Sequence, residues 1–412
     1  MRRTIAILAT LDTKGEEAQF IAGIIRGRGY EPLLVDCGIK GSATVPAGVS
    51  RDEIAAAAGT TLAEVLARND KNAAIDTMAR GAAVLVAARH AAGDLAGVLG
   101  IGGVQGTVIA TRAMQALPVG VPKVMLSAVA NGQAVFGPYV GSKDVAIMHS
   151  VADIMGLNML TRQVMAAAVG AVTGMCDVAV GEQRSGKPVV GMTMAGVTNP
   201  AAMAMRSHLE ARGYEVIGFH CNGIGAKAME ELVADGKIDL VLDLSPHDIG
   251  GLLRNGLMKA RPDRIAASAD AGIPIIFVPG ALDFILRGPI DDVPADLLAR
   301  KHVRHNPIHT HIRASRDEMA DAGAFVGERL GAAKGTVRVI VPQAGFSQFN
   351  AEGGVLHDPV ADAGFVEGVQ SALSANPRGR VTVTTVPLHI NEPAFAEFLA
   401  EAVTELLDPI RR

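Results

Sequence analysis

A glycine-rich stretch from Val98 to Thr107 has the residue types of an anion-binding loop. It reads VLGIGGVQGT, with an apolar lead-in and a glycine cluster, and an apolar-periodic run from 108 to 117 follows. That order predicts a strand, a tight loop and a helix. Such a loop directs backbone N–H groups and a positive helix N-terminus at one place, which suits a phosphate or a carboxylate. The candidate binding residues are Gly102, Gly103, Gln105, Gly106, Thr107 and, at the end of the strand predicted over 122–127, Ser127.

The glycine pattern matches neither of two common phosphate-binding fingerprints. Gln105 stands where a dinucleotide-binding loop would have its last glycine, and no lysine follows Gly106 as it would in a Walker A loop. A strand-to-helix turn that uses glycine only for close packing is the alternative interpretation.

A second candidate group, Asp12-Thr13-Lys14, follows the first predicted strand. The lysine could neutralise phosphate charge, and the carboxylate could hold Mg²⁺ through water. The alternative is a helix start in which Thr13 and Glu16 form a capping box and the lysine is exposed. We expect the glycine loop to lie beside this group, at the same edge of one sheet.

Polar residues in the second half could supply acid–base chemistry. A histidine beside carboxylates at a strand end could act as a general base, while Asp248 could equally cap the helix that follows. The residues proposed for catalysis are Asp243, His247, Asp283 and His305. Cys221 could be a nucleophile, although a small buried cysteine is the commoner case.

Four histidines lie close together between positions 302 and 311. Their spacing could seat a metal ion on a helix, but Pro307 disfavours a helix there. We therefore predict a loop of exposed or hydrogen-bonded imidazoles and no metal site. Whether this cluster is functional stays open from the sequence.

The predicted elements that would position these residues occur twice along the chain. A strand over 4–9, a helix to about 27 and a strand over 32–36 form one βαβ unit, and the segment from 189 to 219 repeats that plan. The motif Arg-Gly-Tyr-Glu ends both helices, at 28–31 and 212–215. We predict an α/β protein of two Rossmann-like domains, at 1–180 and 188–412, with parallel sheets flanked by helices and an apparent internal duplication.

Composition narrows the classes of partner. Hydrophobic residues make up 49% of the chain and charged residues 19%, as in a globular protein. A net charge of -4 and the absence of tryptophan predict no nucleic-acid partner. The apolar stretch 165–175 is too short to span a bilayer, so no membrane partner is expected. The three separated cysteines favour a reduced, cytoplasmic setting over a disulfide framework or a zinc site.

Several motifs resemble the UPF0261 family, also called the Tm-1-like ATP-binding domain family. In the first half they are Thr10-Leu-Asp-Thr-Lys-Gly15, the glycine loop, Tyr139-Val-Gly-Ser-Lys-Asp144 and Ser150-Val-x-Asp-x-x-Gly-Leu-Asn158; in the second they include Pro279-Gly-Ala-Leu-Asp283, His305-Asn-Pro307 and His389-Ile-Asn391. The resemblance covers essentially the whole chain. It implies a two-domain Rossmann-like fold, ATP binding in at least some members, and self-association, but no established reaction.

The chain also departs from the pattern of that family. Val104 and Gln105 replace small residues in the glycine loop, which would narrow a phosphate site. Ser245-Pro246-His247 replaces a threonine-rich stretch, and Phe284-Ile-Leu286 departs from an asparagine-containing run. These departures predict a specialised pocket in the second domain, or one that has lost an activity.

These observations favour a cytoplasmic, nucleotide-binding homodimer. ATP phosphates would lie on the loop 102–107 with Lys14 and Asp12 beside them, and Mg²⁺ is left open as a companion ion. One alternative is an enzyme acting on a small carboxylated or phosphorylated metabolite between the domains. The other is a non-catalytic regulatory module whose ligand shifts domain closure. The Ala-rich helices around 155–172 could form a dimer face, and could equally be core.

Overall fold

The computed structural model describes residues 3–132, 135–178, 185–375 and 380–408. The chain divides into two compact units at residues 183 and 184, inside the linker expected over 181–188. Residues 181–184 of that linker lie outside the described part. The two units are the N-terminal and C-terminal domains below.

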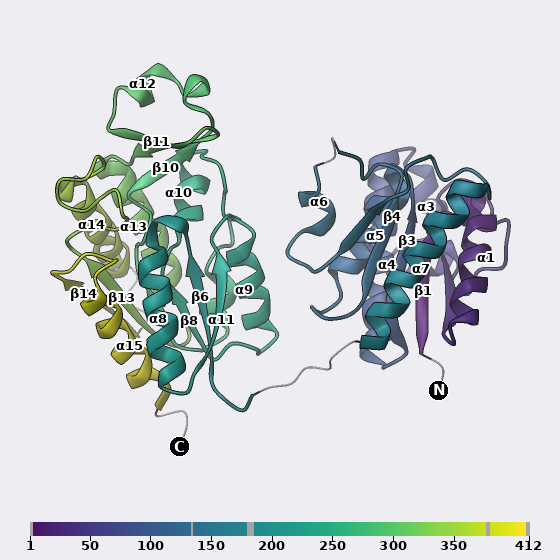
Figure 1. Ribbon diagram of the computed structural model, residues 1–412, viewed down its shortest axis with the longest axis horizontal. Coiled ribbons are helices and arrows are strands. Elements are labelled where there is room, and N and C mark those ends of the chain that lie inside the picture. Colours follow the sequence, from purple (N-terminus) through teal and green to yellow (C-terminus); the bar gives the residue numbers. More distant parts are fainter. Residues whose placement is uncertain (1–2, 133–134, 179–184, 376–379, 409–412) are drawn as a thin grey trace. The chain divides into compact units, whose positions relative to one another are not determined.

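The N-terminal domain is a parallel sheet, sheet A, between two layers of helices (Figure 1). Its described strands lie in the order β2-β1-β3-β4-β5. They are β1 (Thr4–Ala9), β2 (Glu31–Asp36), β3 (Leu95–Gly102), β4 (Lys123–Ser127) and β5 (Ala146–His149). Helices α1 (Leu11–Gly27) and α7 (Met159–Val178) share one apolar core with the sheet, and α2 (Arg51–Ala57), α3 (Leu62–Ala67), α4 (Lys71–Ala91) and α5 (Val104–Gln115) share the other. The short α6 (Gly137–Val140) follows β4.

The C-terminal domain is built around a second parallel sheet, sheet B. Its described strands lie in the order β14-β13-β9-β8-β6-β7. They are β6 (Val189–Met194), β7 (Glu215–His220), β8 (Leu240–Asp243), β9 (Ile275–Phe277), β13 (Thr336–Pro342) and β14 (Arg380–Val386). Helices α8 (Asn199–Ala211) and α15 (Pro393–Leu407) pack on one face, and α9 (Gly225–Ala234), α11 (Ala266–Asp270), α13 (Arg316–Gly331) and α14 (Pro359–Ala375) pack on the other.

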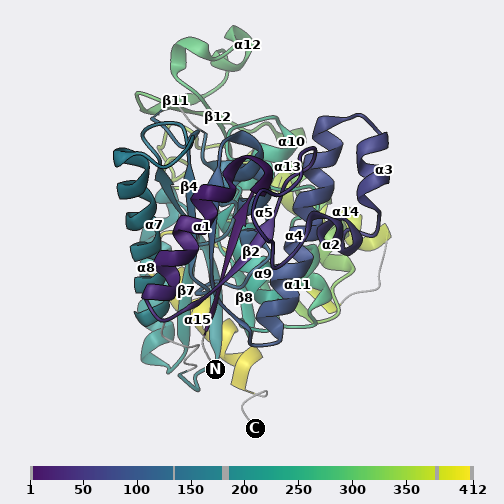
Figure 2. The same cartoon turned by 90° about the vertical axis from the view of Figure 1, so that its right-hand side faces the viewer.

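A small antiparallel sheet, sheet C, is added to the C-terminal domain. Its described strands lie in the order β10-β12-β11, with β10 at Phe284–Arg287, β11 at His302–Asn306 and β12 at His309–Arg313. Helix α10 (His247–Leu253) packs against β10. The connection from β10 to β11 carries α12 (Ala295–Leu298) and projects from the rest of this domain (Figures 1 and 2). The histidine segment predicted as a loop is therefore a β-hairpin.

The described sheets of both domains repeat one strand order, which confirms the predicted α/β class. Counted from its own first strand, each sheet runs 2-1-3-4-5, and sheet B adds a sixth strand. In this topology the chain order reverses between the first and third strands, and ligands bind outside their carboxyl ends. The rule therefore predicts ligand sites at the carboxyl ends of β1 and β3 in sheet A, and of β6 and β8 in sheet B.

Two local predictions are corrected by the structure. Thr13 does not form the expected capping box, because its hydroxyl is exposed and hydrogen-bonds to Thr10, 2.9 Å away. The apolar stretch 165–175 is the centre of the longer helix α7, which is long and apolar enough to cross a membrane. Residues Met165, Val169 and Val172 of this helix are buried against the sheet.

Candidate functional site

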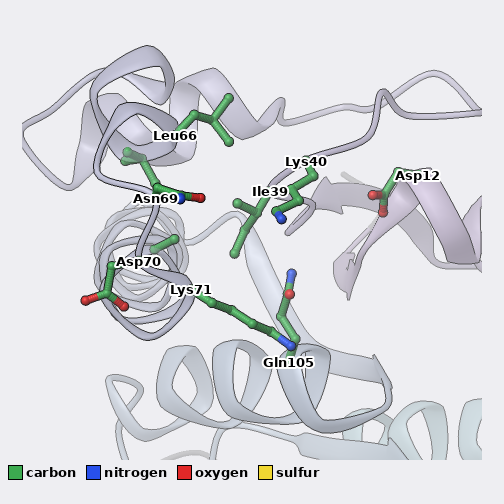
Figure 3. A pocket seen from close by; sticks show the side chains of 10 residues that line it. Asp12, Ile39, Lys40, Leu66, Asn69, Asp70, Lys71 and Gln105 are labelled. Carbon is green, nitrogen blue, oxygen red and sulfur yellow. The ribbon is translucent and has the colours of Figure 1, made fainter.

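A pocket of about 350 Å³ lies at the switch point of sheet A (Figure 3). Its residues come from the start of α1, the loop after β2, helices α3 and α4, and the start of α5. They are Asp12, Ile39, Lys40, Val65, Leu66, Asn69, Asp70, Lys71, Ala74 and Gln105. This volume falls within the range of small-ligand sites, roughly 300–1,000 Å³. Of the residues predicted from the sequence, Asp12 and Gln105 line it.

Two glycines let the glycine loop bring α5 close to β3. A Cβ atom on Gly102 would lie 2.9 Å from the Cα of Gly106, and one on Gly106 would lie 3.0 Å from the carbonyl oxygen of Ile101. Gly103 is the N-cap of α5, and no side chain caps this helix end. The first N–H groups of a helix have no partner within the helix, so those of α5 are available to a ligand beside Gln105.

Two lysines supply positive charge to the pocket. The side chains of Lys40, Lys71 and Gln105 extend toward one shared space in Figure 3, whereas Asp70 points away from it. The Asp70 carboxylate accepts hydrogen bonds from the backbone N–H groups of residues 72 and 73, which makes Asp70 the N-cap of α4. Lys71 is therefore the first residue of a capped helix. Within the described part of the chain, no ion pair involves Lys40 or Lys71.

Only one oxygen of the Asp12 carboxylate has a hydrogen-bond partner among the described residues. One oxygen accepts a hydrogen bond from the backbone N–H of Gly41 at 3.2 Å, and the other is buried without a partner. Asp36 holds this corner of the domain together, because one of its oxygens accepts from the N–H groups of Leu11 (3.0 Å) and Gly38 (2.9 Å). Asp12 lines the pocket, and a carboxylate at this place is a suitable ligand for a cation or for a water bound to one.

The other predicted binding residues lie outside this set. Lys14 does not line the pocket and has non-helical dihedral angles inside α1. Thr107 and Ser127 are buried and share a 2.7 Å hydrogen bond between their hydroxyls, which joins α5 to β4. Sequence reasoning missed Lys40 and Lys71. The available signals were a lysine in the glycine-containing loop after β2 and one directly after a capping aspartate.

A second pocket, of about 180 Å³, lies at the switch point of sheet B. Its described lining comes from the turn after β6, the end of β7, the start of α10, and sheet C. The lining residues are Ala195, Gly196, Val197, His220, His247, Met258, Phe284, Leu286, His305, His309 and His311. We call this the histidine pocket. It brings together His247 and His305, two of the residues proposed for catalysis.

Aromatic rings form a stacked column along this pocket. His311 stacks on Phe284 with ring centroids 4.0 Å apart, and His305 stacks on the other side of His311 at 4.8 Å. His247 stacks on Phe284 at 5.4 Å. The column therefore joins α10 to all three strands of sheet C, and it holds the imidazoles in fixed orientations.

The two buried histidines of the column are held neutral. The pKa of His247 is lowered to about 4, mainly by burial and also by the nearby imidazoles of His220 and His309, against the opposing effect of Asp248. Burial also lowers the pKa of His311 to about 3, together with His305 and other imidazoles. The Nδ1 atoms of His247 and His311 are both buried without a hydrogen-bond partner.

Asp243 lies in a buried ionic network and does not line the histidine pocket. Arg264 contacts three carboxylates, with hydrogen bonds to Asp243 (2.7 Å), Glu230 (2.9 Å) and Asp248 (3.3 Å). The thiol of Cys221 donates to Asp248 at 2.9 Å, and burial raises its pKa well above the ordinary value. A thiol held protonated in this way is a poor nucleophile.

Asp283 lies in a different buried cluster. Its carboxylate accepts a 2.7 Å hydrogen bond from the Ser347 hydroxyl, and its other oxygen is buried without a partner. Burial raises its pKa to about 7, against the lowering effect of Arg313. Arg313 also pairs with Asp362. The four residues proposed for catalysis therefore fall into three separate environments. Within the described residues, no group of three or more histidine, cysteine or acidic side chains is arranged to hold a metal ion.

Comparison with known protein families assigns both halves of the chain. Residues 3–180 match the N-terminal domain, and residues 187–407 the C-terminal domain, of the group described as Uncharacterised protein family (UPF0261). A UPF0261 protein of Clostridium tetani is 35% identical over 408 residues, which cover 99% of this chain and 100% of that protein. A UPF0261 protein of Rhizobium meliloti is 36% identical over 407 residues, with the same coverage.

A plant protein is also similar. The tomato ToMV resistance protein Tm-1(GCR237) is 36% identical over 321 residues, which cover 76% of this chain and 42% of the tomato protein. Among solved structures, the spinosyn rhamnosyltransferase SpnG with spinosyn aglycone aligns over 98% of this chain and 96% of its own, with 12% identity and a TM-score of 0.18. The S. aureus MnaA–UDP co-structure covers 100% and 98%, with 10% identity and a TM-score of 0.21. TM-scores at this level carry no argument about function.

Proposed function

This chain belongs to the UPF0261 family, and we propose that its N-terminal domain binds ATP in the pocket at the ends of β1 and β3. The observation that carries the proposal is the convergence of Lys40 and Lys71 on Gln105 and the start of α5, which no side chain caps. Neither lysine has an ion-pair partner among the described residues. Phosphates are the common ligands of such a site, because lysine charge and helix N–H groups act on them together.

The shape of the pocket supports a ligand with an apolar part. Four apolar side chains also line the pocket, those of Ile39, Val65, Leu66 and Ala74. Val65 and Ala74 are buried parts of the core, whereas Leu66 is 40% exposed. An adenine base placed against these side chains would leave its phosphates between the lysines and Gln105. Ligand pockets of this kind pair an apolar wall with a few polar groups that fix orientation.

Asp12 supports a role for Mg²⁺. Asp12 lines the same pocket as the lysines, where a phosphate-bound Mg²⁺ would need an oxygen ligand, and one of its oxygens is buried with no hydrogen-bond partner among the described residues. The ion usually keeps several waters and takes only one or two carboxylates in nucleotide sites. We therefore propose that Asp12 contacts Mg²⁺ directly or through a water, and that ATP binds with the ion.

The test is calorimetric titration of the full chain with ATP and with ADP, each with and without Mg²⁺. Lys71→Ala and Lys40→Ala should each weaken ATP binding by about 10-fold or more, since a hydrogen bond to a charged group contributes roughly 1.5–3 kcal/mol. Lys334→Ala is the matched control, because Lys334 is an exposed lysine of the other domain that pairs with Asp270.

Lys14→Ala separates this site from the one expected from the sequence. If phosphates lie between Lys40 and Lys71, Lys14→Ala keeps most of the ATP affinity. A large loss in Lys14→Ala with no change in the Lys40 and Lys71 variants would refute the pocket assignment. Saturable binding of ATP that is indifferent to all three lysines would refute a phosphate site in this domain.

Self-association and a cytoplasmic location belong to the same proposal. Met155, four residues before α7, and Met159, its first residue, are 78% and 81% exposed, which supports a partner surface there. Light scattering after size exclusion should give a dimer, and Met159→Ser should shift it toward monomer. The three cysteines are buried and free, as they would be in a reducing compartment.

A further inference from the structure

The histidine pocket has a charge pattern that suits an anion. Its described lining includes five imidazoles and no carboxylate, so every ionisable side chain there is a base. The nearest acid in sequence, Asp248, directs its two oxygens at the thiol of Cys221 and the guanidinium of Arg264. Asp248 therefore does not line the pocket, although its charge still favours the protonated form of His247.

The five imidazoles of the pocket differ in solvent exposure. His220 and His305 are exposed, His309 is half-buried, and His247 and His311 are each 4% exposed. The Nδ1 atoms of His247 and His311 are buried without partners. Buried polar atoms in proteins nearly always have a hydrogen-bond partner, so two such atoms, on rings that both stack on Phe284, are candidates to contact a ligand.

Fold topology independently places a ligand at this position. The turn after β6 and the start of α10 after β8 both line the pocket, and these strands flank the switch point of sheet B. Sheet C closes the pocket from the other side through β10, β11 and β12. The ring column fixes three of the imidazoles, so the donors are positioned before a ligand arrives.

We propose that the histidine pocket binds a small, doubly charged oxyanion, such as a phosphate monoester or a dicarboxylate, through imidazole N–H groups. A pocket of about 180 Å³ admits a compact metabolite and excludes a nucleotide. The site is distinct from the nucleotide pocket proposed above, since it is built entirely from the other domain. A chelated metal fits less well, because the described side chains include no suitably arranged group of three ligands.

Binding at this site requires proton uptake. A neutral imidazole donates through one nitrogen, whereas an imidazolium donates through both. Burial opposes protonation of His247 and His311 in the empty pocket. Repulsion from His220 and His309 adds to this at His247, where Asp248 acts against it, and repulsion from His305, His247 and His309 adds to it at His311. A dianion removes that repulsion. The affinity therefore rises as the pH falls, as long as the ligand keeps its charge.

Calorimetric titration of the full chain with sulfate tests this, because sulfate keeps both charges across the range used. We expect binding about 10-fold tighter near pH 6 than near pH 8, with protons taken up from the buffer, as shown by titrations in two buffers of different ionisation enthalpy. Titration with glycerol 3-phosphate and with succinate then distinguishes a phosphate ligand from a dicarboxylate ligand.

Variants connect the effect to the pocket. His311→Gln and His247→Gln should each reduce sulfate affinity about 10-fold or more and reduce proton uptake. His305→Gln changes an exposed ring, so it tests the site even where a core substitution fails to fold. His208→Gln, on α8 and away from the pocket, should bind as the parent does.

Three results of the titrations with sulfate and Zn²⁺ would overturn the proposal, and a fourth comes from all the anion probes together. The first three are sulfate binding that does not strengthen at lower pH, binding that survives all three pocket substitutions, and saturable binding of Zn²⁺ alone that the same substitutions abolish. The third result would make the pocket a metal site. No binding of sulfate, glycerol 3-phosphate or succinate at any pH by folded protein would also refute it.

Discussion

Arg264 donates hydrogen bonds to both carboxylate oxygens of Asp243, at 2.9 and 2.7 Å, in the interior of the C-terminal domain. Asp243 lies at a strand end, where a catalytic acid would be expected, but its carboxylate is fully engaged by Arg264 and has a structural role. The same guanidinium also contacts Glu230 and Asp248. One buried cation therefore stabilises three carboxylates next to the histidine pocket and keeps Asp248 from lining it.

Arg264→Met should strongly destabilise the C-terminal domain. Removing one partner of a buried ion pair costs about 3–5 kcal/mol, because the remaining charges stay buried without compensation. The pKa values of Asp243 and Glu230 are raised by burial, so protonation relieves the defect and the loss should be smaller near pH 5 than near pH 8. Denaturant unfolding at the two pH values measures this.

Arg261→Met is the control for that experiment. Arg261 lies three residues before Arg264 and makes an exposed ion pair with Asp263. Exposed ion pairs contribute only about 0–1 kcal/mol to stability. Equal losses in the two variants would show that the network around Arg264 does not stabilise the domain.

The fold was more predictable from the sequence than the sites were. Continuous apolar runs such as 4–9 and 189–194 report parallel strands locally, because both faces of those strands are buried. The hairpin of β11 and β12 was missed because its histidines, Pro307 and Asn306 have the composition of a loop. Pairing with β10, a strand distant in sequence, is what makes it a sheet.

The sites depend on contacts that no local pattern encodes. The sequence places Asp12 and Gln105 at strand-to-helix turns, which have a recognisable pattern, whereas Lys40 and Lys71 line the same pocket from other connections. Asp243 and Asp283 lie beside strands, where catalytic acids are often found. In the folded chain, however, Arg264 pairs with the Asp243 carboxylate and Arg313 donates to the Asp283 carbonyl oxygen. A sequence can show which side chains follow a strand, but not which distant charges lie next to them.

The buried histidines should make the protein sensitive to acid. The folded pKa of His247 is about 4 and the ordinary value is 6.5, so between these values the unfolded chain binds more protons than the folded one. Stability from this group is complete above about pH 6.5 and is lost as the pH falls toward 4, by about 3 kcal/mol for the full shift. His247→Leu should reduce the slope of unfolding free energy against pH in this window. An unchanged slope would contradict the assignment of a neutral, buried ring.

Asp283 should change the stability of the protein with pH in the opposite direction to His247. Its folded pKa is about 7 against 3.8, so the folded chain holds the extra proton between these values and stability falls as the pH rises through that window. Asp283→Asn cannot lose a proton, and it should gain relative stability of up to about 4 kcal/mol between pH 4 and pH 8. The measurement is the difference in unfolding free energy between variant and parent at several pH values. Asp291→Asn, in the projecting connection of sheet C, is a suitable control.

The adjacent glycines Gly102 and Gly103, at the start of α5 beside the proposed nucleotide pocket, should respond differently to substitution. At Gly102 a methyl group would lie 2.9 Å from the backbone of Gly106, so Gly102→Ala forces β3 and α5 apart and should cost about 1–3 kcal/mol. At Gly103 nothing lies within 4 Å, so Gly103→Val should fold normally. If phosphates approach the N-terminus of α5 through this space, Gly103→Val weakens ATP binding without changing the melting temperature. Normal ATP affinity in folded Gly103→Val would show that the ligand does not reach the glycine loop.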